Sequence, residues 1–475
     1  MPEFDLAVRG GTVVTASDTM KADVGIKDGK IVALSDQITD AAEQIDATGL
    51  LVLPGGIDSH VHIDQPSGPG IVMADDFESA TRAALAGGNT CIMPFALQEK
   101  GNSLRESVEA YRAKAEGRCH IDTSFHLIIS DPTQQVLGQE LPALVKDGFT
   151  SFKVFMTYDD LVLSDRELLE VFDVARREKA LVMVHCEGYD AIRFMTERLE
   201  NADKTAPFYH GMSRPEIVER EAAHRAISHA QLVDVPIMIV HVSGREAMEQ
   251  IQWAKSRGMK IYAETCTQYI TLTEDDMRGL NMDMAGAKYV CSPPPRDEES
   301  QKAIWEGIQQ GVFHTFSSDH CPFRFEGTDG KQNPKAKTSF RWVPNGIPGV
   351  ETRLPVFFSE GVSKGRISLQ EFVALTSTNH ARMYGLYPRK GSLGIGSDAD
   401  LTLWDPREKR TIRQENLQHG ADYTPWEGFE VTGWPKMVVF GGRLAMRDGE
   451  IFTQPGLGRV LERDLSPFAS TEDPS

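Results

Sequence analysis

The most chemically suggestive short motif in the sequence is the pair His60 and His62, which follows the apolar run LLVLPGG at residues 50–56. In an extended strand, residues i and i+2 project to the same face, so the two imidazoles would stand side by side. Neutral imidazole is the commonest metal ligand among side chains. An H-x-H pair alone is more often an ordinary strand end, so a metal site requires further ligands elsewhere in the chain.

Four more side chains of suitable type follow or lie within apolar, strand-like runs. They are Lys153 in SFKVFM, His185 in VMVHCEG, His241 in MIVHVSG and Asp319 in FSSDHCPF. Taken singly, each has an ordinary explanation as a hydrogen-bonded core residue, a lysine reaching solvent or a turn cap. Because all of them fall at the same end of the same type of element, these ordinary explanations become improbable for the set as a whole.

The lysine indicates what kind of metal site this set would form. An ammonium group repels metal ions, but CO2 can add to the neutral amine of Lys153 and give a carbamate. The carbamate behaves as a carboxylate and can bridge two cations. With the four histidines and Asp319, it predicts a site for two divalent metal ions. Such ligands suit Zn2+ best, with Mn2+, Co2+ or Fe2+ as alternatives.

The elements that would position these residues are short, apolar and rich in β-formers. Eight such runs occur, at residues 50–63, 89–96, 120–129, 149–156, 179–186, 235–243, 260–269 and 312–320. Most are separated by segments with i, i+3, i+4 apolar spacing, such as residues 164–179 and 245–258. This alternation predicts an α/β fold, a (β/α)8 TIM barrel, whose functional residues lie at the carboxyl ends of the strands. A doubly wound open sheet is the alternative, although no G-x-G-x-x-G motif follows the first strand.

Both ends of the chain differ from this pattern and contain hairpin-like runs with D-G and G-G turn signals. We predict a β-sandwich domain formed by residues 1–53 together with residues 388–460, and a catalytic barrel over residues 54–387. Residues 461–475 are polar and predict a loose C-terminal tail.

Composition excludes several classes of partner. The formal net charge of −19 disfavours nucleic acid and anionic membrane surfaces. No apolar run approaches the length of a membrane span, and the N-terminus shows no secretory signal. Six cysteines in 475 residues do not make a disulfide framework, so we expect a cytoplasmic protein.

With these motifs in view, the sequence resembles the dihydropyrimidinase/hydantoinase group of cyclic amidohydrolases in the amidohydrolase superfamily, and is phenylhydantoinase-like. The resemblance runs from GGIDSHVHID through FKVFMTY, CSPPPR, SSDHCPF and VPNGIPGVETRLP to KGSLGIGSDADLTLWDP. It implies a barrel with a β-sandwich from both termini, and two metals held by a carboxylated lysine and five other ligands. The corresponding residues here are His60, His62, Lys153, His185, His241 and Asp319.

The resemblance also implies a reaction and a set of substrate contacts. A ring amide of a hydantoin or dihydropyrimidine would be opened to an N-carbamoyl amino acid, with Asp319 and Tyr158 as catalytic residues. Tyr158, Ser292 and Asn345 would bind the substrate. Allantoinase or cyclic-imide hydrolase activity is the alternative, and a non-catalytic scaffold is disfavoured because all six ligand types are present.

Assembly is a further expectation from the resemblance. Members of this group are homo-oligomers, tetramers or dimers, and the aromatic-rich segment at residues 421–435 corresponds to a region of subunit contact. The loop at residues 64–73 would form part of the substrate entrance.

Overall fold

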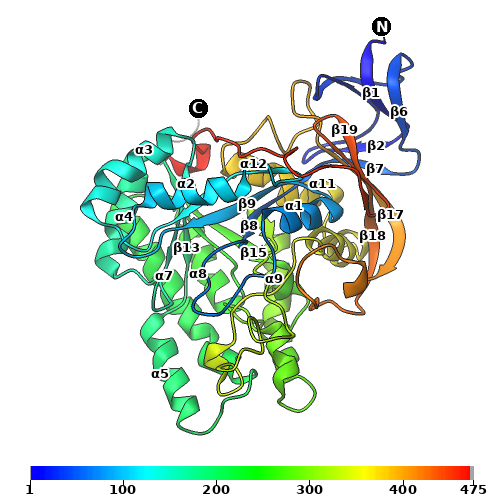
Figure 1. Cartoon of the computed structure of the whole chain (residues 1–475). Coiled ribbons are helices and arrows are strands. Elements are labelled where there is room, and N and C mark those ends of the chain that lie inside the picture. Colours follow the sequence, from blue (N-terminus) through cyan, green and yellow to red (C-terminus); the bar gives the residue numbers. More distant parts are fainter. Residues whose placement is uncertain (1, 471–475) are drawn as a thin grey trace.

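The computed structural model describes residues 2–470, and its largest element is a parallel barrel near the middle of the chain (Figure 1). Within the described residues the barrel has eight strand positions, one of them split in two. Its strands are β8 (Gly56–Val61), β9 (Asn89–Leu97), β10 (Asp122–Thr123) with β11 (His126–Ile128), β12 (Ser151–Phe155), β13 (Leu181–His185), β14 (Ile237–Ile239), β15 (Ile261–Cys266) and β16 (Thr315–Ser317).

The last strand returns to the first and nearly closes the barrel. Each neighbouring pair from β8 to β16 is parallel. Beyond β16, His320 forms a parallel bridge with Val61, and its carbonyl accepts a hydrogen bond from the amide of His62 at 2.6 Å. The predicted (β/α)8 TIM barrel is therefore confirmed, and each of the eight apolar runs contains a barrel strand.

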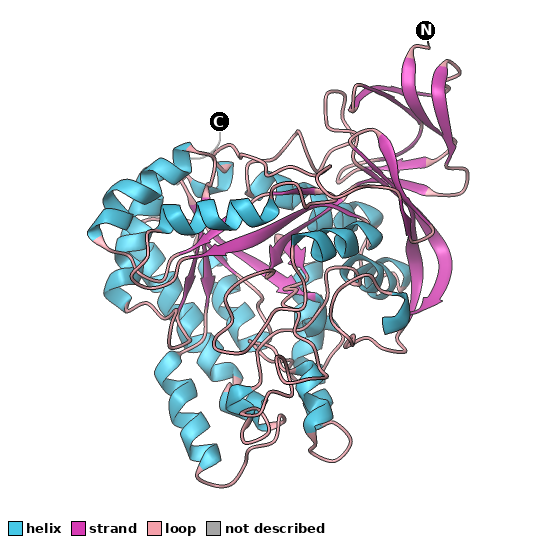
Figure 2. Ribbon diagram, in the orientation of Figure 1, coloured by secondary structure: helices cyan, strands magenta, loops and turns pink. Residues whose placement is uncertain are grey.

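Helices surround the barrel strands (Figure 2). Helix α4 (Asp165–Glu178) shows why they form where the sequence predicts: Ser164 and Glu167 make a capping box, and Leu168, Val171 and Phe172 are on the buried face. The other helices of the barrel and its loops are α1 (Phe77–Ala86), α2 (Leu104–Ala115), α3 (Leu141–Lys146), α5 (Tyr189–Glu200), α6 (Tyr209–Ser213), α7 (Glu216–Val233), α8 (Arg245–Ser256), α9 (Glu298–Gln309), α10 (Arg353–Phe357), α11 (Leu369–Val373) and α12 (Asn379–Met383). No helix in residues 2–470 combines the length and apolarity needed to cross a membrane.

Two further sheets lie beside the barrel and combine strands from the N-terminal and C-terminal parts of the chain. The four-stranded sheet has the order β5 (Lys30–Ser35), β4 (Asp23–Lys27), β1 (Phe4–Arg9), β6 (Ala41–Asp46). The seven-stranded sheet has the order β20 (Glu450–Ile451), β19 (Arg443–Arg447), β18 (Glu430–Phe440), β17 (Leu401–Thr411), β7 (Leu51–Pro54), β2 (Thr12–Val14), β3 (Thr19–Lys21).

The two sheets share one apolar core, which gives the sandwich that the sequence predicts. Leu6 and Ile26 from the smaller sheet pack in the same cluster as Val52, Leu403 and Val439 from the larger one. The antiparallel pairing of β7 with β17 joins the two ends of the chain. The boundaries near residues 53 and 388 stay a prediction.

One expectation from the sequence is wrong, and another stays a prediction. The C-terminal tail is not loose over its described part, because Arg463 is buried and donates hydrogen bonds to the hydroxyl of Ser151 and the carbonyl of Phe125. Residues 471–475 of that tail lie outside the described residues. In the aromatic segment at 421–435, Trp426 and Trp434 are buried within the chain whereas Asp422 and Glu427 are exposed, so its expected part in subunit contacts stays a prediction. Polarity and aromatic content alone do not reveal which partner covers a segment.

A buried cluster of charges fastens the C-terminal part of the chain to the barrel. The ammonium of Lys390 lies 2.6 Å from Asp122 in β10 and 3.0 Å from Asp398, and it also contacts Asp400 next to β17. The three carboxylates raise the pKa of Lys390 and keep it charged despite burial. These carboxylates are close enough to hold a cation, and the lysine already occupies that role.

Replacing this lysine should therefore destabilise the fold. Lys390→Met leaves three carboxylates without their cation, and removing one partner of a buried ion pair costs about 3–5 kcal/mol. Denaturant unfolding measures the loss. The matched control is Lys30→Met, because Lys30 pairs with Asp398 but its side chain is 45% exposed. A loss below about 1 kcal/mol for Lys390→Met, similar to a surface pair, would contradict this account.

Candidate metal centre

All six predicted ligands lie at the carboxyl ends of barrel strands, on one mouth of the barrel. They are His60 in β8, His62 after it, Lys153 in β12, His185 at the end of β13, His241 after β14 and Asp319 after β16. Residues separated by up to 259 positions are thus brought together, because parallel strands place their carboxyl ends at the same edge.

His60 and His62 both point their Nε2 atoms towards the carboxylate of Asp319. Its Oδ1 lies 3.2 Å from Nε2 of His60 and 3.6 Å from Nε2 of His62. Nζ of Lys153 is 3.3 Å from Nε2 of His60. Ligand atoms of His60, His62 and Asp319 all lie within 4.8 Å of one another, which is close enough for one metal ion to bind all three.

The other two histidines lie next to His60 and complete the arrangement. The ring centroids of His185 and His241 are 4.4 Å apart, and those of His241 and His60 are 5.3 Å apart. Nδ1 of His241 is buried and has no hydrogen-bond partner in the described residues. The structure therefore brings all six side chains into one cluster, with a nitrogen that its protein neighbours leave unsatisfied.

Burial sets the protonation of the four imidazoles. Desolvation lowers the pKa of His62 to about 3 and that of His185 to about 4. The same cause lowers the pKa values of His60 and His241 well below the usual range. At neutral pH the rings are thus uncharged, which is the form that binds metal ions.

The lysine and the aspartate are also shifted away from their charged forms. Burial lowers the pKa of Lys153 to about 8, partly offset by Asp319 and Glu264. Burial also raises the pKa of Asp319, partly offset by Lys153. A neutral amine is the form that reacts with CO2, and divalent cations would compensate a carbamate and a carboxylate here. The donor set therefore fits a site for divalent metals.

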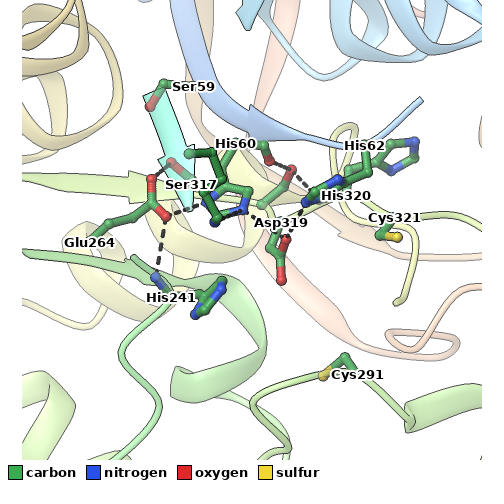
Figure 3. Close-up of polar contacts among 12 residues, drawn as sticks. Ser59, His60, His62, His241, Glu264, Cys291, Ser317, Asp319, His320 and Cys321 are labelled. Carbon is green, nitrogen blue, oxygen red and sulfur yellow. Dashed lines mark hydrogen bonds and ion pairs between the residues drawn. The ribbon is translucent and has the colours of Figure 1, made fainter. Parts of the chain in front are cut away.

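Two buried glutamates that the sequence analysis missed orient the histidines. Nδ1 of His60 donates to Glu264 at 2.6 Å, which turns its Nε2 towards Asp319. Figure 3 shows that Glu264 also accepts hydrogen bonds from the hydroxyl of Ser317 and the backbone nitrogen of His241. Such outer carboxylates fix the tautomer and direction of a metal-binding histidine.

The second glutamate acts on the other side of the cluster. Nε2 of His185 donates to Glu187 at 2.7 Å, and the guanidinium of Arg214 donates to the same carboxylate oxygen at 2.7 Å. This leaves Nδ1 of His185 as the free ligand atom. A sequence signal existed for both glutamates: Glu264 interrupts the apolar run KIYAETCTQY, and Glu187 is two residues beyond His185.

The three predicted substrate contacts lie together next to this cluster. The ring of Tyr158 is 5.4 Å from that of His185. Burial raises the pKa of Tyr158 to about 12, partly offset by hydrogen bonds with Ser292 and Asn345, so its hydroxyl stays a donor at neutral pH. Tyr158 and Asn345 also line a cavity of about 120 Å³.

The backbone is in the left-handed region at three of these positions. The φ angles are 74° at Tyr158, 40° at His241 and 51° at Asp319. Residues other than glycine rarely adopt such angles, and they concentrate at functional sites. The surrounding fold therefore fixes the directions of these side chains at some conformational cost.

The loop at residues 64–73 lies directly beside the histidine pair. Gln65 contacts Nδ1 of His62 at 2.8 Å, and the ring of Phe95 stacks on that of His62 with centroids 4.7 Å apart. Val72 of this loop is 55% exposed. Residues of this loop line a larger, polar cavity of about 880 Å³ on the outer side.

Known proteins match this chain over nearly its whole length. Residues 51–445 match the amidohydrolase family. D-hydantoinases from Ralstonia pickettii and Geobacillus stearothermophilus are each 42% identical, covering 97% and 96% of this chain and 99% and 96% of their own lengths. The crystal structure of a dihydropyrimidinase from Brevibacillus agri NCHU1002 has a TM-score of 0.93 at 42% identity, over 97% of this chain and 99% of that one. The chain therefore belongs to the amidohydrolase family, within its hydantoinase and dihydropyrimidinase group.

Proposed function

We propose that the protein is a metal-dependent cyclic amidohydrolase that opens the ring amide of hydantoins or dihydropyrimidines to N-carbamoyl amino acids. The observation that carries this proposal is the convergence of four neutral imidazoles, a buried lysine and an aspartate at one barrel mouth. The full-length similarity to proteins named D-hydantoinase supports the choice of substrate class. The same similarity does not favour the alternative, allantoinase or cyclic-imide hydrolase activity.

The six converging residues would hold two divalent metal ions, with Lys153 carboxylated on its Nζ. When bound, such metals activate a water molecule for attack and polarise the carbonyl oxygen of the substrate. Zinc is the metal we propose first, because imidazole and carboxylate ligands suit it. The predicted cytoplasmic location and assembly into a tetramer or dimer stay predictions.

The side chains of this chain would supply the proton transfer and the orientation of the ring. Asp319 takes a proton from the attacking water and delivers it to the ring nitrogen as the carbon–nitrogen bond breaks. The hydroxyl of Tyr158 donates to the carbonyl oxygen as negative charge develops there. Ser292 and Asn345 hold the polar O=C–N–H edge of the ring, and the buried cluster around them excludes bulk water.

The direct test is turnover by the metal-loaded protein. We expect ring opening of dihydrouracil or of hydantoins. The loss of the ring's ultraviolet absorbance measures the rate, and identification of the N-carbamoyl product confirms which bond is broken. Allantoin and simple cyclic imides form the comparison set. Hydrolysis confined to allantoin or to imides would replace the proposed substrate class, and no hydrolysis of any cyclic amide would overturn the proposal.

The role of Lys153 can be tested through metal content. Lys153→Ala removes the proposed bridge, so we expect loss of both metals and of activity together. Short carboxylic acids added to this variant should restore part of both, because they can occupy the space of the missing carbamate. Elemental analysis measures the metals, and Lys146→Ala, at an exposed position in α3, is the matched control. Retention of two metals per chain in Lys153→Ala would rule out the bridge.

A different substitution separates metal binding from proton transfer. Asp319→Asn keeps the size and one oxygen of the side chain but removes its basicity. Most of the metal should therefore remain while kcat falls by about 10²–10⁴-fold, the usual contribution of a general acid–base group. Asp173→Asn on the exposed face of α4 controls for the loss of a carboxylate. Near-normal turnover by the Asp319 variant would show that another group moves the proton.

A further inference from the structure

Lys331 is a buried cation that the proposed reaction does not use. Its side chain is fully buried. In the described part of the chain it forms no ion pair with a carboxylate, and its titratable neighbours are the thiols of Cys291 and Cys321, which burial keeps neutral. Burial lowers the pKa of Lys331 to about 7. A buried lysine without a countercharge is costly for the fold, so its presence calls for a role.

The ammonium of Lys331 joins two separate loops at their backbones. Nζ donates to the carbonyl of Val290 at 2.7 Å and to the carbonyl of Pro344 at 2.6 Å. Val290 is two residues before Ser292, and Pro344 directly precedes Asn345. The two carbonyls need two N–H donors. The amine of Lys331 supplies at least two whether it is charged or neutral, so the link does not depend on its protonation.

Backbone hydrogen bonds within its own loop hold the lysine in place. It lies in the excursion formed by residues 324–343, which leaves the barrel after β16 and returns before Asn345. The backbone nitrogen of Lys331 donates to the carbonyl of Arg324 at 2.8 Å. Asn333 closes the excursion through a hydrogen bond of 2.9 Å to the carbonyl of Trp342. The amine is thus a fixed anchor and not a mobile surface group.

The two loops have one other direct link at this point. The amide of Gly346 donates to the carbonyl of Val290 at 3.1 Å, so this carbonyl accepts hydrogen bonds from Gly346 and from Lys331 together. The segment with Ser292 is also held by His210, whose Nε2 contacts the carbonyl of Cys291 at 2.9 Å. Lys331 therefore links the backbone of the Ser292 segment to the backbone of the Asn345 segment through its side chain.

We propose that Lys331 is a positioning residue that sets the distance between Ser292 and Asn345, and thereby the affinity for the polar edge of the ring substrate. The inference rests on the proposed function, because it takes these two residues as the substrate contacts. It assigns no chemical step to the lysine. Its loss should weaken binding of the ring in the ground state and transition state alike, which raises KM more than it lowers kcat.

The experiment compares Lys331→Met with the wild type, both as metal-loaded full-length protein. Methionine fills a similar volume without donating hydrogen bonds. We expect KM for the hydantoin or dihydropyrimidine substrate to rise about 10-fold or more, with kcat changed by less than about threefold and two metals retained. Lys335→Met is the matched control, because Lys335 lies on the same excursion, is exposed and packs over the ring of Trp342. Its KM should equal that of the wild type.

Two further measurements keep the test decisive. Hydrogen exchange at the amide of Gly346 should be faster in Lys331→Met, because the second support of the Val290 carbonyl is gone. If Lys331→Met does not fold, Lys331→Gln replaces it, and the shorter amide should raise KM by a smaller factor with metals retained.

The outcomes separate this inference from the proposed function. Wild-type ring opening together with an unchanged KM in the Lys331 variant overturns the inference alone. A loss of folded protein in proportion to activity, with KM unchanged, also overturns it, because this result indicates a purely structural role. No ring opening by the wild type overturns the proposed function and this inference with it.

Discussion

The structure depends on one constraint: ionisable side chains are buried together where the barrel strands end. Desolvation keeps the imidazoles of His62 and His185 neutral, and it disfavours the charged forms of Lys153 and Asp319. Apolar side chains at these positions would cost the folded state less free energy than buried ionisable groups do. Divalent cations are the partners that would turn this unfavourable set into a favourable one, since they bind neutral imidazoles and compensate a carbamate and a carboxylate.

Neighbouring residues of the site fix the orientation of the histidine side chains. Glu264 and Glu187 each accept a hydrogen bond from one ring nitrogen of a histidine and leave the other nitrogen for the site. Arg214 anchors Glu187 from behind, and its guanidinium also lies 5.5 Å from the ring centre of Tyr158. Buried polar contacts therefore join the proposed metal ligands to the proposed substrate contacts.

Sequence alone predicted the barrel and the six converging residues, because apolar strand runs alternate with amphipathic helical segments and the carboxyl ends of parallel strands meet at one edge. It did not predict Glu264 or Lys331, because their roles depend on partners far away in the chain, and it missed Glu187 although its partner His185 is only two residues away. The prediction of a loose tail was wrong at Arg463, a charged residue that is buried by tertiary packing. The sequence also did not show that the chain itself covers the side chain of Trp426.

The central claim is that Lys153 is carboxylated and bridges two metal ions. Carbon NMR of the metal-loaded protein, prepared with 13C-labelled bicarbonate, tests it most directly because it observes the added carbon itself. The account predicts a carbamate carbon signal in the active enzyme, with its loss when the metals are removed by a chelator. A fully metal-loaded and active enzyme without this signal would contradict the account.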